Sequence, residues 1–209
     1  MSARGKFQTV RLFRPLGLLV TAIALSGCAT AVPLKPTIDH LPSVSKIPLS
    51  AGIYYSPELR SYKYENDLPG CKVAPLGQAS VTLFERLFPM MFHSAVTLES
   101  RQDLLSNKTN LSLVIEPDIE NAECTWSRGA YLRITYHFTL YSPNGEALAY
   151  WGVTGSGKAE IHFYWFPQPG GPNPTARKAA ELAMEDAANK IVAQFREIPA
   201  VKQLLQEKR

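Results

Sequence analysis

The segment Tyr131–Tyr141, with the sequence YLRITYHFTLY, decides the expected fold of this chain. Its side chains alternate between apolar and polar, which is the period of a β-strand with one buried face and one exposed face. The apolar series is Leu132, Ile134, Tyr136, Phe138 and Leu140, and the polar series is Arg133, Thr135, His137 and Thr139. The pattern predicts a long strand packed on a core.

A turn and a second strand follow directly. Ser142–Gly145 reads SPNG, and an Asn-Gly pair is typical of the tight turn of a β-hairpin. The hairpin partner is predicted at Ala147–Thr154, and Lys158–Phe166 extends it or adds a strand. Pro167–Pro174, rich in proline and glycine, is predicted to be a loop.

The remaining periodic segments, before and after this hairpin, complete an α+β pattern. Further strands are predicted at Gly52–Tyr55, Arg60–Tyr64, Ala95–Leu98, Asn110–Glu116 and Ile119–Trp126. Helices are predicted at Leu76–Phe92, where Pro89 should kink or shorten the helix, at Thr175–Phe195 with Asn173 or Thr175 as cap, and at Ala200–Glu207. We therefore expect an α+β domain with a single mixed or antiparallel sheet and helices mainly on one face.

The N-terminal residues 1–27 have the features of an export signal. Four basic residues and no acid precede an apolar run, Leu16–Leu25, which is about half the length of a membrane-spanning helix. The net charge of the chain is +4, and these four residues account for all of it. The remaining side chains are neutral in sum, which removes the global-charge argument for nucleic-acid binding.

The signal segment ends Leu25-Ser26-Gly27-Cys28, which resembles the lipobox of bacterial lipoproteins. The resemblance implies that Cys28 becomes the first mature residue, with a diacylglyceryl group on its thiol and an acyl chain such as palmitate on its amine. Because Ala29 follows, and not Asp, the resemblance implies an outer-membrane address facing the periplasm. An ordinary signal peptide cut elsewhere near Cys28, or an uncleaved anchor, are the alternatives.

Residues 28–50 are predicted to be a tether, and residues 51–209 a periplasmic domain. Pro33, Pro36, Pro42 and Pro48 prevent a helix in the tether, and serines between them add polar spacing. Such a stretch is able to lift a domain away from the bilayer.

Cys71 and Cys124 are the other cysteines of the chain. A disulfide between them is expected in an oxidising compartment, and with Cys28 lipidated no other pairing exists. Closing a loop of about 50 residues is worth about 4 kcal/mol in the chain-entropy model. Two separate buried thiols are the alternative. No metal or other cofactor is expected, because neither cysteine has a close histidine partner.

Two glycine-rich motifs fail as catalytic signatures. Gly152–Ala159 resembles a phosphate-binding loop, but Ala159 stands where a metal-binding hydroxyl is needed, and a strand-like sequence follows. Ser156 lacks the glycine two residues before it that a nucleophile elbow requires. These glycines predict a bend or bulge in a strand. The four histidines show no ligand spacing, so no enzyme activity is expected.

Four consecutive aromatic residues, Phe163, Tyr164, Trp165 and Phe166, are the most unusual local feature. A strand turns about half of its side chains to each face, so these cannot all enter one core. Packing under the following loop is one interpretation. The other is a contact surface for a partner protein or a membrane interface.

The body of the chain resembles small periplasmic domains related to the curli-secretion lipoprotein and to the amino-terminal domain of TolB. The matching segments are Tyr54-Tyr55, a helix led by Gly77, Leu113–Pro117, Leu140–Gly145 and an alanine-rich C-terminal helix. The resemblance implies a scaffold or accessory role in an envelope assembly, transport or secretion complex, with a protein partner. A module that binds a small ligand or lipid between the sheet and the helix Leu76–Phe92, and an envelope hydrolase, are the alternative functions.

Overall fold

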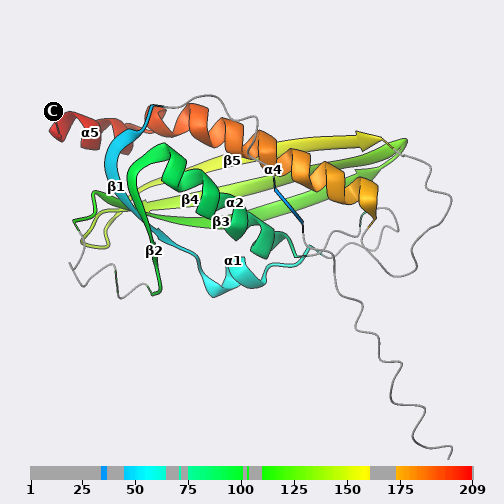
Figure 1. Ribbon diagram of the computed structural model, residues 1–209, viewed down its shortest axis with the longest axis horizontal. Coiled ribbons are helices and arrows are strands. Elements are labelled where there is room, and N and C mark those ends of the chain that lie inside the picture. Colours follow the sequence, from blue (N-terminus) through cyan, green and yellow to red (C-terminus); the bar gives the residue numbers. More distant parts are fainter. Residues whose placement is uncertain are drawn as a thin grey trace, which may run out of the picture. The chain divides into compact units, whose positions relative to one another are not determined.

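The computed structural model describes residues 34–36, 45–64, 71, 75–100, 103, 110–160 and 173–208. Within these segments, one five-stranded sheet carries the helices (Figure 1). The strands are β1 (Ile47–Tyr54), β2 (Phe92–Leu98), β3 (Leu113–Trp126), β4 (Gly129–Tyr141) and β5 (Ala147–Glu160). The helices are α1 (Pro57–Ser61), α2 (Leu76–Met91), α4 (Pro174–Gln194), the 3-10 turn η1 (Phe195–Glu197) and α5 (Pro199–Glu207). Of the helices so described, none has the length and apolar character needed to cross a membrane.

The sheet is mixed, and its strand order is β2-β1-β3-β4-β5. β1 pairs in parallel with both β2 and β3, whereas β3, β4 and β5 form an antiparallel meander. The first strand in the sequence therefore lies inside the sheet. The predicted α+β class with a single sheet is confirmed.

The strand and turn that decide the fold are as predicted. In β4, the five apolar side chains of the alternating series are at most 1% exposed. The turn that joins it to β5 closes with a hydrogen bond of 2.8 Å from the Ser142 N–H to the Glu146 carbonyl. Gly145 adopts a φ of 86°, the left-handed region that glycine reaches without strain.

The helix α2 lies on the buried face of β4 and packs its aromatic side chains there. The ring of Phe84 meets those of Tyr136 and Phe138 edge-on, with centroids 5.2 and 5.7 Å apart. The Tyr136 hydroxyl lies 2.9 Å from Ser80 Oγ, which in turn donates to the Leu76 carbonyl at 2.7 Å. The helix continues past Pro89 and ends at Met91, one residue before the predicted end.

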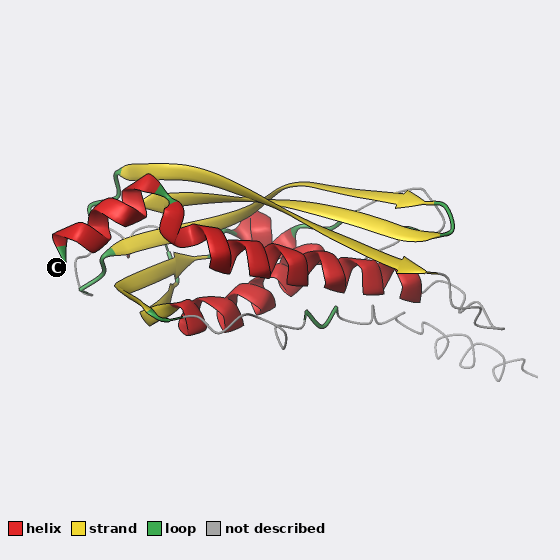
Figure 2. Cartoon of the chain, turned by 90° about the horizontal axis from the view of Figure 1, so that it is seen from above, coloured by secondary structure: helices red, strands yellow, loops and turns green. Residues whose placement is uncertain are grey.

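The long helix α4 runs along β5 on the same face of the sheet (Figure 2). Asn173 caps it as predicted, with its Oδ1 accepting the Thr175 N–H at 2.9 Å. A Cβ placed on Gly155 would lie 2.0 Å from the Ala183 carbonyl oxygen, and one on Gly157 would lie 2.0 Å from that of Ala179. The predicted bend or bulge at these glycines is wrong, because β5 keeps an unbroken register from Ala149 to Glu160. The glycines instead let a helix backbone touch the strand.

The predicted strand Arg60–Tyr64 is also wrong. Pro57–Ser61 forms the short helix α1, because Ser56 Oγ accepts the Leu59 N–H at 3.0 Å and Pro57 occupies the first helical turn.

The two strands predicted at Asn110–Glu116 and Ile119–Trp126 are one. β3 runs through Pro117, with an irregularity in its pairing with β4 between Ile119 and Asn121. Its pairing with β1 ends at Ile115, so a proline two residues later interrupts no ladder on that side. The acidic stretch Glu116–Glu123 is therefore part of the sheet.

The folded domain begins earlier than the predicted boundary at Ala51. β1 starts at Ile47, and Leu34 belongs to the hydrophobic core, with 7% of its surface exposed. Residues assigned to the tether are therefore part of the domain.

Candidate interaction surfaces

Two of the predicted functional features lie outside the described residues. These are the lipidation site Cys28 and the aromatic contact run Phe163–Phe166. The nearest described residues are Leu34 for Cys28, and Glu160 and Asn173 on the two sides of the aromatic run.

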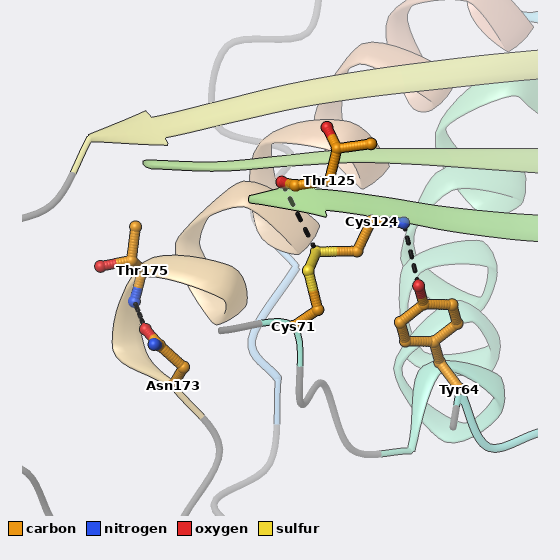
Figure 3. Close-up of a disulfide and its surroundings, with 6 residues drawn as sticks. All are labelled: Tyr64, Cys71, Cys124, Thr125, Asn173 and Thr175. Atoms are coloured by element: carbon orange, nitrogen blue, oxygen red, sulfur yellow. Dashed lines mark hydrogen bonds between the residues drawn. A yellow bond between two sulfur atoms is a disulfide. The ribbon is translucent and has the colours of Figure 1, made fainter. Parts of the chain in front are cut away.

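The predicted disulfide is present. Cys71 and Cys124 are bonded, with their Cα atoms 5.8 Å apart, and both side chains are buried (Figure 3). The Cys124 N–H donates to the Tyr64 hydroxyl at 2.9 Å. The bond joins the stretch that precedes α2 to β3 near the N-terminal end of α4. Because the chain has three cysteines, Cys28 is the one left outside this bond.

A short N-terminal segment, Leu34–Pro36, is held by both long helices. The Lys35 N–H donates to Glu181 Oε1 on α4 at 3.3 Å, and Arg86 Nη1 on α2 donates to the Pro36 carbonyl at 3.1 Å. Leu34 and Pro36 are buried, while the Lys35 side chain is exposed. Glu181 also pairs with Arg177, one turn earlier, at 3.2 Å. Sequence analysis missed this segment because its prolines indicated only an extended chain.

The face of the sheet opposite α2 and α4 carries the polar series of β4 and the outward residues of β5. The rings of His137 and Tyr150 stack with their centroids 5.8 Å apart, and Tyr150 is 68% exposed. Thr135 Oγ1 lies 3.0 Å from Thr154 Oγ1. Tyr131, at the far end of β4, is also exposed. We refer to this surface, from Tyr131 to Tyr150, as the open face.

A cavity of about 590 Å³ lies between the start of β5 and the corner formed by η1 and α5. Its lining comprises Leu148, Ala149, Tyr150, Trp151, Gln194, Glu197, Ile198, Pro199 and Ala200. Apolar and amide groups predominate in this lining, so the cavity offers a ligand mainly a shape and an apolar surface, and few reactive side chains.

The interface between α2 and the sheet, where a ligand pocket was an alternative, is filled by side chains. Phe84, Phe88, Tyr136 and Phe138 are 0% exposed, and their rings contact one another across this interface. Burial raises the pKa of Tyr136 well above its ordinary value, and the hydrogen bond with Ser80 opposes that shift. This cluster is core.

The segment that resembles a phosphate-binding loop, Gly152–Ala159, is part of the strand β5. Its backbone groups join the ladder with β4 and contact α4, so they form no cradle for phosphate. Of the histidines in the described segments, His93 is exposed at the start of β2 and His137 stacks on Tyr150.

The outer edge of β5 is bonded to side chains of α4, which sequence analysis did not foresee. Asp186 Oδ2 accepts the Ser156 N–H, and Lys190 Nζ donates to the Thr154 carbonyl, each at 2.8 Å. The two side chains also form an ion pair at 2.8 Å. Their spacing of four residues is a common helical ion pair, and only the sheet order shows that they cover a strand edge.

No protein-family model and no curated protein matches the sequence. Several solved structures align with it at low identity. A protein from Xanthomonas campestris described as XCC0632 aligns with a TM-score of 0.48 and 12% identity, over 84% of this chain and 96% of its own. A PelC dodecamer from Paraburkholderia phytofirmans aligns with a TM-score of 0.41 and 11% identity, over 79% and 91%. A minor lipoprotein from Acinetobacter baumannii aligns with a TM-score of 0.37 and 8% identity, over 71% and 92%. Likeness at this level transfers neither activity nor partner.

Proposed function

We propose that this chain is a lipid-anchored, non-enzymatic protein of the bacterial cell envelope, acting as a scaffold or accessory in an assembly, transport or secretion complex. The observation that carries the proposal is the sequence Leu25–Cys28, placed directly after a basic head and an apolar run. Together they have the order of a lipoprotein signal. Ala29 favours the outer membrane, with the domain in the periplasm.

The cysteines support this assignment independently. Cys71 and Cys124 form a buried disulfide, a bond typical of oxidising compartments such as the periplasm. The pairing leaves Cys28 as the thiol available for a lipid. Two or three acyl chains on one residue give lasting attachment, because each buried methylene adds about 0.8 kcal/mol.

The partner contact is assigned to the aromatic run Phe163–Phe166. The run begins three residues after Glu160, the last residue of the edge strand β5. Aromatic side chains are enriched in protein interfaces, where they supply a large contact area.

A ligand-binding module is the runner-up function. The expected site beneath α2 is filled by Phe84, Phe88, Tyr136 and Phe138, which disfavours it. The cavity beside Tyr150 and Pro199 is the place where a small apolar ligand would fit best.

The lipid assignment is tested by Cys28→Ser. Loss of acylation, seen by mass spectrometry of the processed protein, should accompany release from the membrane fraction. The double variant Cys71→Ser/Cys124→Ser is the matched control, because it removes both other thiols and should keep its acyl chains. A processed, acylated Cys28→Ser protein would refute the assignment.

The scaffold role is tested by affinity capture from detergent-solubilised membranes after cross-linking. Trp165→Ala/Phe166→Ala should lose a partner that the wild type retains, while Tyr150→Ala serves as the control for loss of an exposed aromatic residue elsewhere. Recovery of the same partners by all three proteins would show that the run makes no essential contact.

A further inference from the structure

The segment Leu34–Pro36 is the most N-terminal part of the chain that the structure describes, and it is attached to the folded domain. Leu34 is part of the main hydrophobic cluster with 7% of its surface exposed, and Pro36 is buried. The backbone of Lys35 and Pro36 is bonded to Glu181 on α4 and to Arg86 on α2. These contacts fix the exit point on the helical layer, on the side of the sheet opposite the open face.

The chain is fixed to the same layer a second time. Arg196, in the turn that follows α4, donates a hydrogen bond to the Ser45 carbonyl. Ile47 and Leu49 of β1 then enter the core, each 1% exposed. Ser45 is thus the next described residue after Pro36 that is fixed to this layer.

The distance from Cys28 to each fixed point has a covalent limit. Six peptide units separate Cys28 from Leu34, and a fully extended chain of six units spans about 21 Å. Seventeen units separate Cys28 from Ser45, with an extended span of about 60 Å. The covalent limit set at Leu34 is therefore about one third of the limit set at Ser45.

We propose that Leu34–Pro36 is a clamp that keeps the helical layer of α2 and α4 against the bilayer and turns the open face of the sheet away from it. The inference rests on the proposed lipid at Cys28, because a domain without that anchor has no membrane to face. The partner of this surface is a lipid bilayer. Of the predicted tether, only the five residues Ala29–Pro33 then separate Cys28 from the clamp.

Two exposed positions at the same end of the molecule report on this orientation. Lys178 on α4 lies one turn before Glu181 and is exposed. Tyr131 lies on the open face, paired with Lys158, and Lys158 shares a cavity of about 320 Å³ with Lys178. The positions therefore differ mainly in which layer of the fold they occupy.

The experiment uses the full lipidated protein in phosphatidylethanolamine and phosphatidylglycerol vesicles that contain an acceptor-labelled lipid. A donor fluorophore is introduced at position 178 or 131 through a non-natural amino acid, so that Cys71 and Cys124 stay bonded. We expect higher energy transfer from position 178 than from position 131. Inserting twelve Gly/Ser residues between Ala31 and Val32 should abolish the difference without touching the clamp.

Two further variants remove the clamp and leave the length of the chain between Cys28 and Leu34 unchanged. Arg86→Gln/Glu181→Gln replaces the charged side chains that hold the segment, and Leu34→Asp removes its buried anchor. Both should lower transfer from position 178, as the insertion does, with unchanged circular dichroism showing that the domain is folded.

The outcomes separate this inference from the proposed function. Equal transfer from positions 178 and 131 in an acylated wild type would overturn the clamp and leave the lipoprotein assignment standing. A wild type without acyl chains, released from vesicles like Cys28→Ser, would overturn both. Unchanged energy transfer in the insertion variant would also contradict the clamp, because a longer chain between Cys28 and Leu34 should allow the domain to change its orientation.

Discussion

Asp186 on α4 accepts a hydrogen bond of 2.8 Å from the backbone N–H of Ser156, on the outer edge of β5. Lys190 pairs with the same carboxylate and donates to the Thr154 carbonyl. β5 is the last strand in the order of the sheet, and within the described residues no strand lies beside this edge. Side chains of the covering helix thus satisfy backbone groups that would otherwise offer a template for another strand.

Replacing Asp186 by alanine should uncover this edge. Because Asp186 is 36% exposed, we expect a modest loss of about 1 kcal/mol in the free energy of unfolding. We also expect concentration-dependent self-association through β5. Urea denaturation and light scattering measure the two effects. Glu185→Ala, which removes the adjacent acid, is the control, and equal behaviour of the two variants would contradict the role of Asp186.

The contact between α4 and the glycines of β5 makes a sharp prediction. In Gly157→Ala, the new methyl group would meet the Ala179 carbonyl at 2.0 Å, so the backbones must move apart. Such overpacking costs about 1–3 kcal/mol or more. At Gly152 of the same strand, the new Cβ would lie 3.7 Å from its nearest contact, so Gly152→Ala should change stability by less than about 0.5 kcal/mol. Equal urea midpoints for the two variants would contradict this prediction, because they would show that α4 moves away from β5 at little cost in stability.

The buried pair of Ser80 and Tyr136 predicts unequal effects of removing either hydroxyl. Ser80 has one hydroxyl hydrogen, which it donates to the Leu76 carbonyl, so Tyr136 donates to Ser80. Tyr136→Phe leaves the Ser80 bond intact and should cost about 1 kcal/mol, whereas Ser80→Ala strands the tyrosine donor and should cost about 1–3 kcal/mol. A double-mutant cycle by urea denaturation gives the coupling. A larger cost for Tyr136→Phe than for Ser80→Ala would reverse the assigned direction.

The same tyrosine makes stability depend on alkaline pH. Burial raises the pKa of Tyr136 far above 10.0, the value expected in the unfolded chain. The folded state therefore holds the proton more strongly, and its stabilisation is complete below pH 10.0 and declines above it. Above that value, wild type should lose up to about 1.4 kcal/mol per pH unit more than Tyr136→Phe. Parallel slopes for the two proteins between pH 10 and about pH 11 would contradict this.

Reducing the disulfide should cost about 4 kcal/mol in the chain-entropy model, because Cys71 and Cys124 are 53 residues apart. The measurement is the urea midpoint with and without a thiol reductant. Cys71→Ser/Cys124→Ser is the control, because the reductant should not shift its midpoint. An equal shift in both proteins would mean that the reductant acts elsewhere.

The sequence predicted best where one periodicity runs through many residues. β4 alternates over its whole length and α4 keeps one small-residue face for twenty-one residues, and both are as expected. Short segments were harder, since Arg60–Tyr64 carries two tyrosines at strand spacing while the stronger signal, the cap Ser56 followed by Pro57, precedes it.

What the sequence could not show depends on neighbours distant in the chain. The local sequence does not distinguish a glycine that bends a strand from one that lets a helix pack closely on it. At Gly155 the close packing is with Ala183 and Ala187 of α4. Likewise, Leu34 is one apolar residue among prolines in the sequence. Its attachment depends on Glu181 and Arg86, which bond to the neighbouring backbone. The cysteine pairing was predictable because only two cysteines remained once Cys28 was assigned to the lipid.

The interior position of β1 has a consequence for how the chain folds. The meander of β3, β4 and β5 joins neighbours in sequence through short connections, and such local contacts form quickly. β1, in contrast, joins Ala51 to Ala95 on one side and to Leu113 on the other. In a chain that emerges N-terminus first, β1 waits unpaired until both partners have been delivered. We therefore expect the pairing of β1, Ile47–Tyr54, with both of its neighbours to be the slow step in completing the sheet.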